Sequence, residues 1–253
     1  MRKVLAILHY EYKMQMSRMA AWSILFVAIG IALVDAFPSG SNIARLEFLV
    51  KPAYFISRIY SKNGLLLIFG IMFLLSSRLP IDKKMGVKSL FMVASLKKGE
   101  YVLGKLLGNF LYAITMMILF LGFNIFVYAI FIPEKNSFFE YMLPFIKTVI
   151  FNIFPAGFFI SFCAVVLPAI IDIRIFYFIS SAYFLLNAVF VDSSESVPFY
   201  LITSGDLKKI VWQYPGYPFS DTQSILANLI FMISCGLLAW FFLLIKRDFW
   251  RGE

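Results

Sequence analysis

Histidine and cysteine are nearly absent from this chain, which has one histidine, His9, and two cysteines, Cys163 and Cys235, among 253 residues. A metal site built on several histidines, such as that of an intramembrane metalloprotease, is therefore excluded. The chain also lacks a Gly-x-Ser-x-Gly motif and a second histidine that could activate a serine. Both cysteines lie in apolar runs, which is typical of small buried residues. These absences argue against an intramembrane enzyme, for which His9 would be the last candidate group.

Charge is scarce as well, since only 15% of residues are charged and 61% are apolar. A mean hydropathy of +0.85 predicts an all-α integral membrane protein. The 30 Phe and 13 Tyr suit rings packed on rings or a wide apolar cavity. The net charge of +9 indicates basic loops at the cytoplasmic leaflet, not a nucleic-acid partner. No cleavable signal peptide is expected, because the first apolar run starts near Ala20 behind a charged segment.

The apolar runs predict one transmembrane domain with six spans and an N-terminal amphipathic helix over residues 1–19. In that helix one face carries Leu5, Leu8, Tyr12, Met16 and Met19, which favours a helix on the cytoplasmic membrane surface over a frayed basic terminus. We expect a kink near Pro155 in the fourth span. The predicted spans cover residues 20–37, 63–79, 106–132, 143–167, 175–191 and 224–245. The second of these is short, and an earlier start near Phe55 is the alternative.

The positions of the cations predict the orientation. The two termini, the loop 78–105 and the turn at Arg174 carry 15 cations, against 7 on the opposite side. The positive-inside rule therefore places both termini and this loop in the cytoplasm. On the outside, residues 41–62 suit a segment along the membrane surface. The external segment 192–221 holds two short apolar pieces, which fit either a re-entrant pair of helices or an ordinary loop.

The loop 78–105 is the longest charged interruption in the chain, and its middle, Val87–Leu96, fits a short amphipathic helix. Gly99–Lys105 has the spacing of a phosphate-binding P-loop. However, Leu106 stands where a Ser or Thr should hold magnesium, so we interpret the match as chance. No acidic residue lies in mid-span. Among the few amides and hydroxyls there, Asn152 beside Pro155 is the candidate pathway residue, although helix–helix hydrogen bonding is the commoner role.

Asp82–Gly108, DKKMGVKSLFMVASLKKGEYVLGKLLG, together with the six-span pattern, resembles the membrane subunits of ABC exporters of the second type. That group includes drug, polysaccharide, lipid and peptide exporters. The chain departs from the family at Lys83–Lys84, where a glutamate is frequent, and at Ser95–Leu96, where a proline is frequent. The resemblance assigns an ATPase-coupling role to the loop residues Lys83, Lys84, Gly86, Leu90, Lys97, Lys98, Tyr101, Gly104 and Lys105.

The resemblance implies a permease subunit that pairs with a second permease, alike or different, and rests on a separate cytoplasmic ATPase. ATP and magnesium would bind that ATPase, and this chain would hold no cofactor and catalyse nothing. The substrate would be apolar or amphipathic, such as a peptide, a lipid-like compound or a drug. The expected location is a bacterial plasma membrane, with lipid as a further partner. The alternative is a membrane-embedded immunity or assembly factor that sequesters a peptide or partner without pumping.

Overall fold

The computed structural model describes residues 2–37, 50–85, 96–131, 137–190 and 222–245. Across those ranges all regular structure is helical, as the composition predicts. The elements are α1 (Arg2–Met16), α2 (Met19–Asp35), α4 (Pro52–Arg58), η2 (Ile59–Asn63), α5 (Gly64–Ser76), α6 (Arg78–Lys84), α8 (Lys98–Phe131), α9 (Phe138–Thr148), η3 (Val149–Ile153), α10 (Phe154–Ile170), α11 (Ile173–Phe190) and α13 (Thr222–Ile245).

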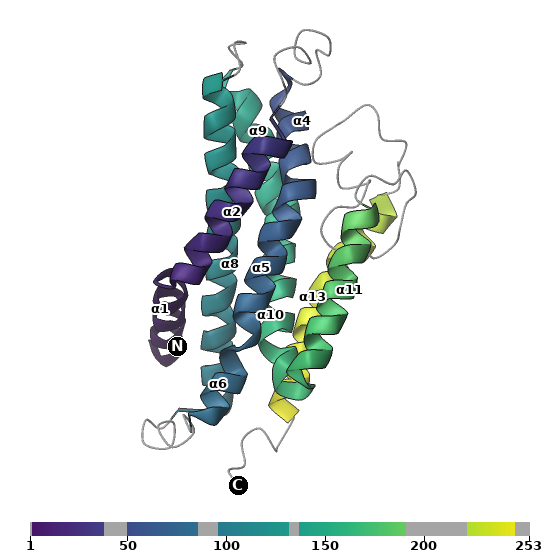
Figure 1. Cartoon of the computed structure of the whole chain (residues 1–253). Helices are drawn as coiled ribbons and strands as arrows, with labels where there is room; N and C mark the ends of the chain where they lie inside the picture. Colours follow the sequence, from purple (N-terminus) through teal and green to yellow (C-terminus); the bar gives the residue numbers. More distant parts are fainter. Residues whose placement is uncertain (1, 38–49, 86–95, 132–136, 191–221, 246–253) are drawn as a thin grey trace.

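Helix α8 is the element around which the others pack. Its 34 residues would extend about 51 Å at 1.5 Å per residue, more than the hydrocarbon core needs. It contacts α1, α2, α4, α5 and α10, while α11 and α13 pack against the bundle through α5 and α10. The start of α1, helix α6 and the end of α13 lie toward the same end of the bundle (Figure 1). We call this the inner end, following the predicted orientation, and the opposite end the outer end.

The structure confirms several helices of membrane-spanning length. Three are long and apolar enough to cross a bilayer, and the pair α1 and α2, bent by 59°, makes a fourth if counted as one broken span. Among the described residues, α11 and α13 contribute shorter apolar helices, Ile173–Val189 and Leu229–Ile245. The three long helices are Pro52–Asp82, Lys98–Phe131 and Phe138–Ile170. A helical membrane protein is thus supported, and six spans remain a prediction.

The second span corrects a predicted boundary. Its helix starts at Pro52, close to the alternative start near Phe55 and well before Asn63, so residues 52–62 are continuous with the span. Pro52 suits the first turn of a helix because its missing N–H would be unpaired there. The side chain of Arg58, a cation within this part of the helix, donates from Nη2 to Asp35 O at 2.8 Å. Arg58 therefore meets a backbone acceptor at the outer end of α2 while the helix continues past it.

The loop 78–105 is also shorter than predicted. Arg78–Lys84 is helical, and α8 begins at Lys98, eight residues before the predicted start of the third span at Leu106. The predicted helix Val87–Leu96 falls outside the described residues except for Leu96, which is not helical. The external segment 192–221 lies outside them as well.

The fourth span contains a π-helical turn where a kink was expected. In η3 the hydrogen bonds span one residue more than in an α-helix, and the Phe154 N–H donates to Val149 O. Pro155 follows directly and occupies the first turn of α10. The helix Phe138–Ile170 continues through both features. A π-helical turn and a proline are both common sites of helix kinks, so the kink near Pro155 stays a prediction. A second π-helical turn, η2, occurs in the second span.

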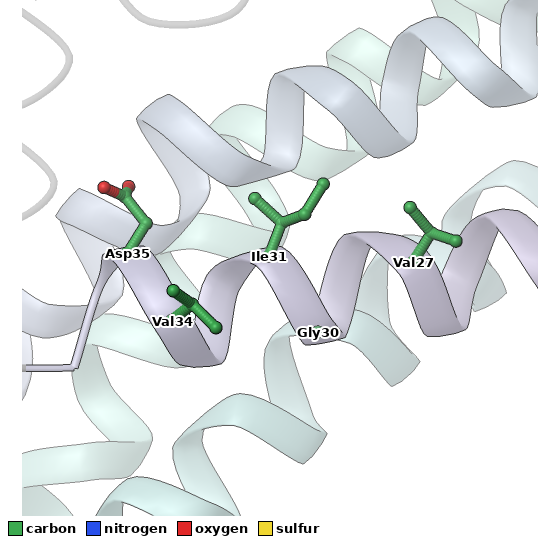
Figure 2. Close-up of a pocket in the computed structure, with 5 residues that line it drawn as sticks. All are labelled: Val27, Gly30, Ile31, Val34 and Asp35. Carbon is green, nitrogen blue, oxygen red and sulfur yellow. The ribbon is translucent and has the colours of Figure 1, made fainter.

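Helix α2 carries a shallow groove on its exposed face. The groove encloses about 430 Å³ and is lined by Val27, Gly30, Ile31, Val34 and Asp35 (Figure 2). Gly30 has no neighbouring atom within 4 Å of where a Cβ would lie, which leaves the groove open. Apart from Asp35 its lining is apolar, so this surface offers little chemistry for a polar ligand.

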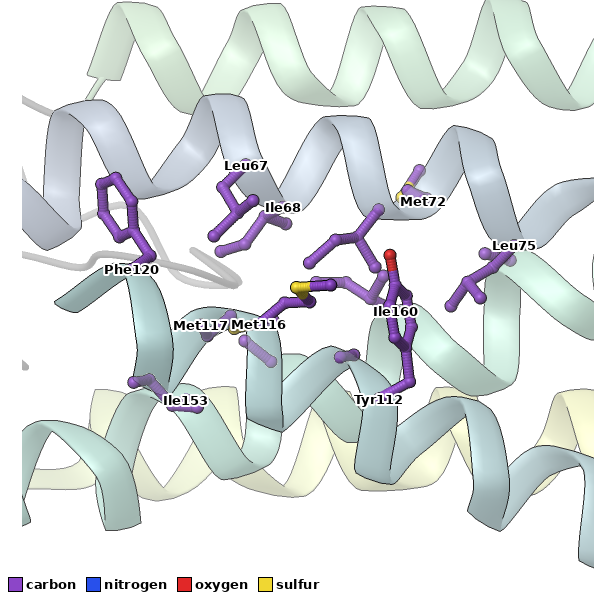
Figure 3. Packing of buried hydrophobic residues seen from close by; sticks show 14 of the residues in the cluster. Leu67, Ile68, Met72, Leu75, Tyr112, Met116, Met117, Phe120, Ile153 and Ile160 are labelled. Atoms are coloured by element: carbon purple, nitrogen blue, oxygen red, sulfur yellow. The ribbon is translucent and has the colours of Figure 1, made fainter. Parts of the chain in front are cut away.

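The apolar core lies between α5, α8 and α10. Leu67, Ile68, Met72 and Leu75 of α5 face Tyr112, Met116, Met117 and Phe120 of α8, with Ile153 and Ile160 beside them (Figure 3). Toward the outer end, rings of α4, α8 and α9 meet Phe37, which lies just past the end of α2. Phe55 stacks on Tyr128 with centroids 3.7 Å apart, and Phe37 lies 5.1 Å from Phe55. We call Phe37, Phe55, Tyr128 and Tyr141 the outer ring cluster.

Candidate functional site

Two glycines of α8 hold α1 close along its inner half. Gly104 and Gly108 are four residues apart and lie on one face of the helix. A Cβ added to Gly104 would lie 2.9 Å from Val4 O, and one added to Gly108 would lie 2.8 Å from Leu8 O. Small residues at this spacing let two helix backbones approach closely. Helix α1 therefore packs on α8 and runs beside it.

Beside this contact, polar side chains from three helices meet in the protein interior. We call them the inner cluster. Glu11 and Lys105 are each 3% exposed and Arg78 is 5% exposed, which is rare for charged residues unless they are paired. The cluster comprises Glu11 and Gln15 of α1, Arg78 and Asp82 of α6, and Tyr101, Lys105 and Asn109 of α8.

Glu11 is the centre of the cluster. Its Oε1 accepts hydrogen bonds from Arg78 Nε at 2.9 Å and from Asn109 Nδ2 at 3.2 Å. Its Oε2 lies 3.7 Å from Lys105 Nζ. One carboxylate from the N-terminal helix therefore contacts side chains of both α6 and α8.

Asp82 balances the second cation. Its Oδ2 accepts from the Tyr101 hydroxyl and from Lys105 Nζ, and Lys105 Nζ lies 3.3 Å from the Tyr101 oxygen. Two carboxylates thus face two cations, and the formal charge of the cluster is zero. Burying charges is tolerable only with such pairing, because each unpaired ion would lose its hydration without compensation.

Amide groups complete the hydrogen bonding. Gln15 Nε2 donates to Asn109 Oδ1 at 2.8 Å, and Asn109 Nδ2 also donates to Lys105 O at 2.8 Å. At the edge, Arg18 Nη1 donates to Gln15 Oε1 at 3.3 Å. The pKa of Arg18 is lowered, first by burial and then by repulsion from Arg78. Attraction to Glu11 offsets only part of this effect.

The cluster joins the two ends of the long basic loop. Arg78 and Asp82 lie in α6 at the start of the loop 78–105, Tyr101 and Lys105 lie in α8 at its end, and Glu11 binds partners from both. Lys98 adds a further connection, since its Nζ donates to Leu244 O at the end of α13 at 2.6 Å. A cation at a helix C-terminus also interacts favourably with the helix dipole. The base of the loop is thus fixed to α1 and to the last helix.

The predicted coupling residues fall into three groups. Tyr101, Gly104 and Lys105 are buried against α1 and α6, so their contacts lie within the chain. Lys84 and Lys97 are exposed, while Lys98 is half-buried; Lys83 lies in α6, and nothing is described of its side chain. Gly86 and Leu90 lie outside the described residues. The P-loop-like stretch forms the first two turns of α8, and its lysine is paired with two carboxylates.

Sequence reasoning missed Glu11, Gln15, Arg78 and Asn109 as a set. A signal was present, because polar residues recur four positions apart at 11 and 15, at 78 and 82, and at 101, 105 and 109. The apolar stripe predicted on α1 lies beside its packed face. Leu5 is 59% exposed, Tyr12 and Met16 pack partly against the core, and Glu11 and Gln15 are buried. Met19, the last residue of the predicted stripe, begins α2.

The candidate pathway residues Asn152 and Pro155 are both buried within the chain. Asn152 is 2% exposed, and neither of its amide atoms has a hydrogen-bond partner among the described residues. It therefore lies in the interior of the chain.

The inner cluster connects α1, α6 and α8 through its charged side chains. Its titratable groups are paired with one another, and no group of three His, Cys, Asp or Glu side chains within the described ranges could hold a metal ion. Comparison with family models, curated proteins and solved structures finds no match to this chain. The structure supports a helical membrane protein in which ion pairs connect the two ends of a basic loop to α1.

Proposed function

We propose that this chain is the permease subunit of an ATP-driven ABC exporter of the second type. A separate cytoplasmic ATPase would bind ATP and magnesium and would dock on the loop 78–105. A second permease subunit would complete the pathway. The substrate would be an apolar or amphipathic compound, such as a peptide, a lipid-like molecule or a drug, moved out of the cytoplasm or the inner leaflet of the plasma membrane.

The observation that carries the proposal is the inner cluster at the base of the basic loop. A loop that only connects two spans needs no buried ion pairs, and burying them costs hydration energy. A loop that transmits force needs stiff ends. Glu11, Arg78, Asp82 and Lys105 join the helices on both sides of the loop to α1. A push on the loop would therefore move α1, α6 and α8 as one body, and α2 would follow through its bend.

Affinity purification tests the proposal. The tagged chain, extracted from its native membrane in mild detergent, should co-purify with an ATPase that mass spectrometry identifies. Lys84→Glu combined with Lys97→Glu should weaken this association and lower transport per ATP hydrolysed, because both cations are exposed at the ends of the loop. These sites are preferable to Lys98, whose reversal would also disturb the contact with Leu244.

Lys51→Glu provides the matched control, since Lys51 is an exposed cation at the other end of the bundle. It should leave both readouts unchanged. If the purified chain binds no ATPase, and its activity persists in cells that lack one, the exporter proposal fails. An activity that also survives the Lys84→Glu/Lys97→Glu change would point to sequestration without pumping.

A further inference from the structure

Helix α1 presents different chemistry on each side. The packed face contains Val4, Ile7, Glu11 and Gln15, which contact α8 or the inner cluster. At 3.6 residues per turn, the next side along carries the apolar stripe of Leu5, Leu8, Tyr12 and Met16. The side after that, which we call the outer face, carries the exposed residues Arg2, His9 and Lys13.

The docking of α1 fixes the direction of these surfaces. The close approach at Gly104 and Gly108 and the ion pairs of Glu11 prevent the helix from rolling without exposing charge. At its end, Trp22 Nε1 donates to Met16 O at 2.7 Å, which closes the bend to α2. Tyr12 and Met16 of the stripe pack partly against the core, and the Tyr12 hydroxyl donates to Thr115 Oγ1 at 3.4 Å. Leu5 and the adjoining outer face are exposed and point away from the bundle.

This pair of surfaces matches the boundary of a lipid leaflet. The apolar stripe favours the acyl region, and Leu5 with 59% exposure would otherwise meet water. The cations beside it need anions, and the headgroups of anionic lipids supply them at that depth. Lys84 and Lys97 are also exposed at this end of the bundle. A leaflet of neutral lipid would cover the stripe but leave Arg2 and Lys13 without counter-charge.

We propose that the outer face and stripe of α1 bind anionic phospholipid of the inner leaflet. Since Glu11 links α1 to both ends of the loop 78–105, occupancy by anionic lipid would set the position of the loop. The inference rests on the membrane orientation used in the proposed function, but it requires no ATPase. The two proposals therefore fail in different experiments.

A fluorophore on α1 tests this binding in the full chain. His9→Cys, in a chain with Cys163→Ala and Cys235→Ala, places one label on the outer face. The protein is reconstituted with phosphatidylcholine and graded fractions of brominated phosphatidylglycerol, or of brominated phosphatidylcholine. Quenching gives the relative binding constant of the two lipids at the label. A clear preference for phosphatidylglycerol is expected, falling in 1 M salt, where the Debye length is about 3 Å.

Arg2→Gln with Lys13→Gln should lower this preference by about fivefold per cation, or about 25-fold together. The control variant, Lys51→Gln with Lys147→Gln, removes two cations toward the outer end. It should leave the preference for phosphatidylglycerol unchanged. Equal quenching by both lipids would overturn the proposal, as would an equal loss in the control variant. A label that neither lipid quenches would also overturn it, and would show that protein covers this face.

Discussion

The two ends of α8 are held by different chemistry. At the inner end, Glu11, Arg78, Asp82 and Lys105 fix α8 to α1 and α6 through paired charges. At the outer end, the rings of Phe37, Phe55 and Tyr128 fix it to α2 and α4. Ion pairs in an apolar interior are directional and costly to separate, whereas stacked rings tolerate small displacements. We infer that the inner end moves as a unit and that the outer end can rearrange.

The largest expected effect comes from removing one charge of the inner cluster. Glu11→Gln leaves Arg78 and Lys105 buried against one carboxylate, so we expect it to lower the free energy of unfolding by about 3 kcal/mol. The measurement is denaturant unfolding in mixed micelles. Glu140→Gln changes an exposed carboxylate of α9 and should cost less than about 0.5 kcal/mol.

A double variant separates charge balance from packing. Adding Arg78→Met to Glu11→Gln restores a neutral cluster, so the pair should cost less than the sum of the two single changes. If the losses of the two single variants simply add, Glu11 and Arg78 do not stabilise each other, and paired charges do not hold the inner end of α8.

The second prediction concerns the contact of α1 with α8. Gly108→Ala would place a Cβ 2.8 Å from Leu8 O, and the backbone of α1 would have to shift, at a cost of about 2 kcal/mol. Hydrogen exchange should then rise along α1. Gly122→Ala, on the same helix with nothing within 4 Å, should be neutral or slightly stabilising. Equal exchange in the two variants would contradict close packing of α1.

The third prediction addresses the outer ring cluster. Phe55→Leu keeps an apolar side chain but removes the stack on Tyr128, for an expected loss of about 1 kcal/mol. Because the ends are held independently, hydrogen exchange in α1 should not change, and the loss should add to that of Glu11→Gln. Phe138→Leu, at an exposed ring, is the control. Coupling between Phe55 and Glu11 would show that the two ends are not independent.

Hydropathy predicted the helical class, because an apolar chain with so few charged residues suits a lipid environment, where a helix satisfies its own backbone hydrogen bonds. It placed the start of the second span at Asn63, with Phe55 as the alternative, because charged residues such as Arg58 interrupt the apolar run; the helix starts at Pro52, and a carbonyl of α2 accepts a hydrogen bond from Arg58. It also missed the inner cluster. A single glutamate on an amphipathic helix is typical of a solvated face, and only the tertiary packing of α1 on α8 brings Arg78 and Lys105 to Glu11. The role of Tyr101, Gly104 and Lys105 in coupling remains a prediction.

The smallest predicted effect, and one of opposite sign, is at Asn152. Its amide atoms are buried and have no hydrogen-bond partner within the part of the chain that the structure describes, so Asn152→Leu should be neutral or stabilise the protein by up to about 1 kcal/mol. The same substitution at Asn109 should destabilise, because Asn109 bonds to Glu11, Gln15 and the Lys105 carbonyl. Unfolding in mixed micelles measures both. If Asn152→Leu destabilises by more than about 1 kcal/mol, the amide is satisfied by bound water or ligand, because buried polar groups are otherwise costly. The outer half of the bundle would then contain a polar site, and the contrast between a charged inner end and an apolar outer end would not hold.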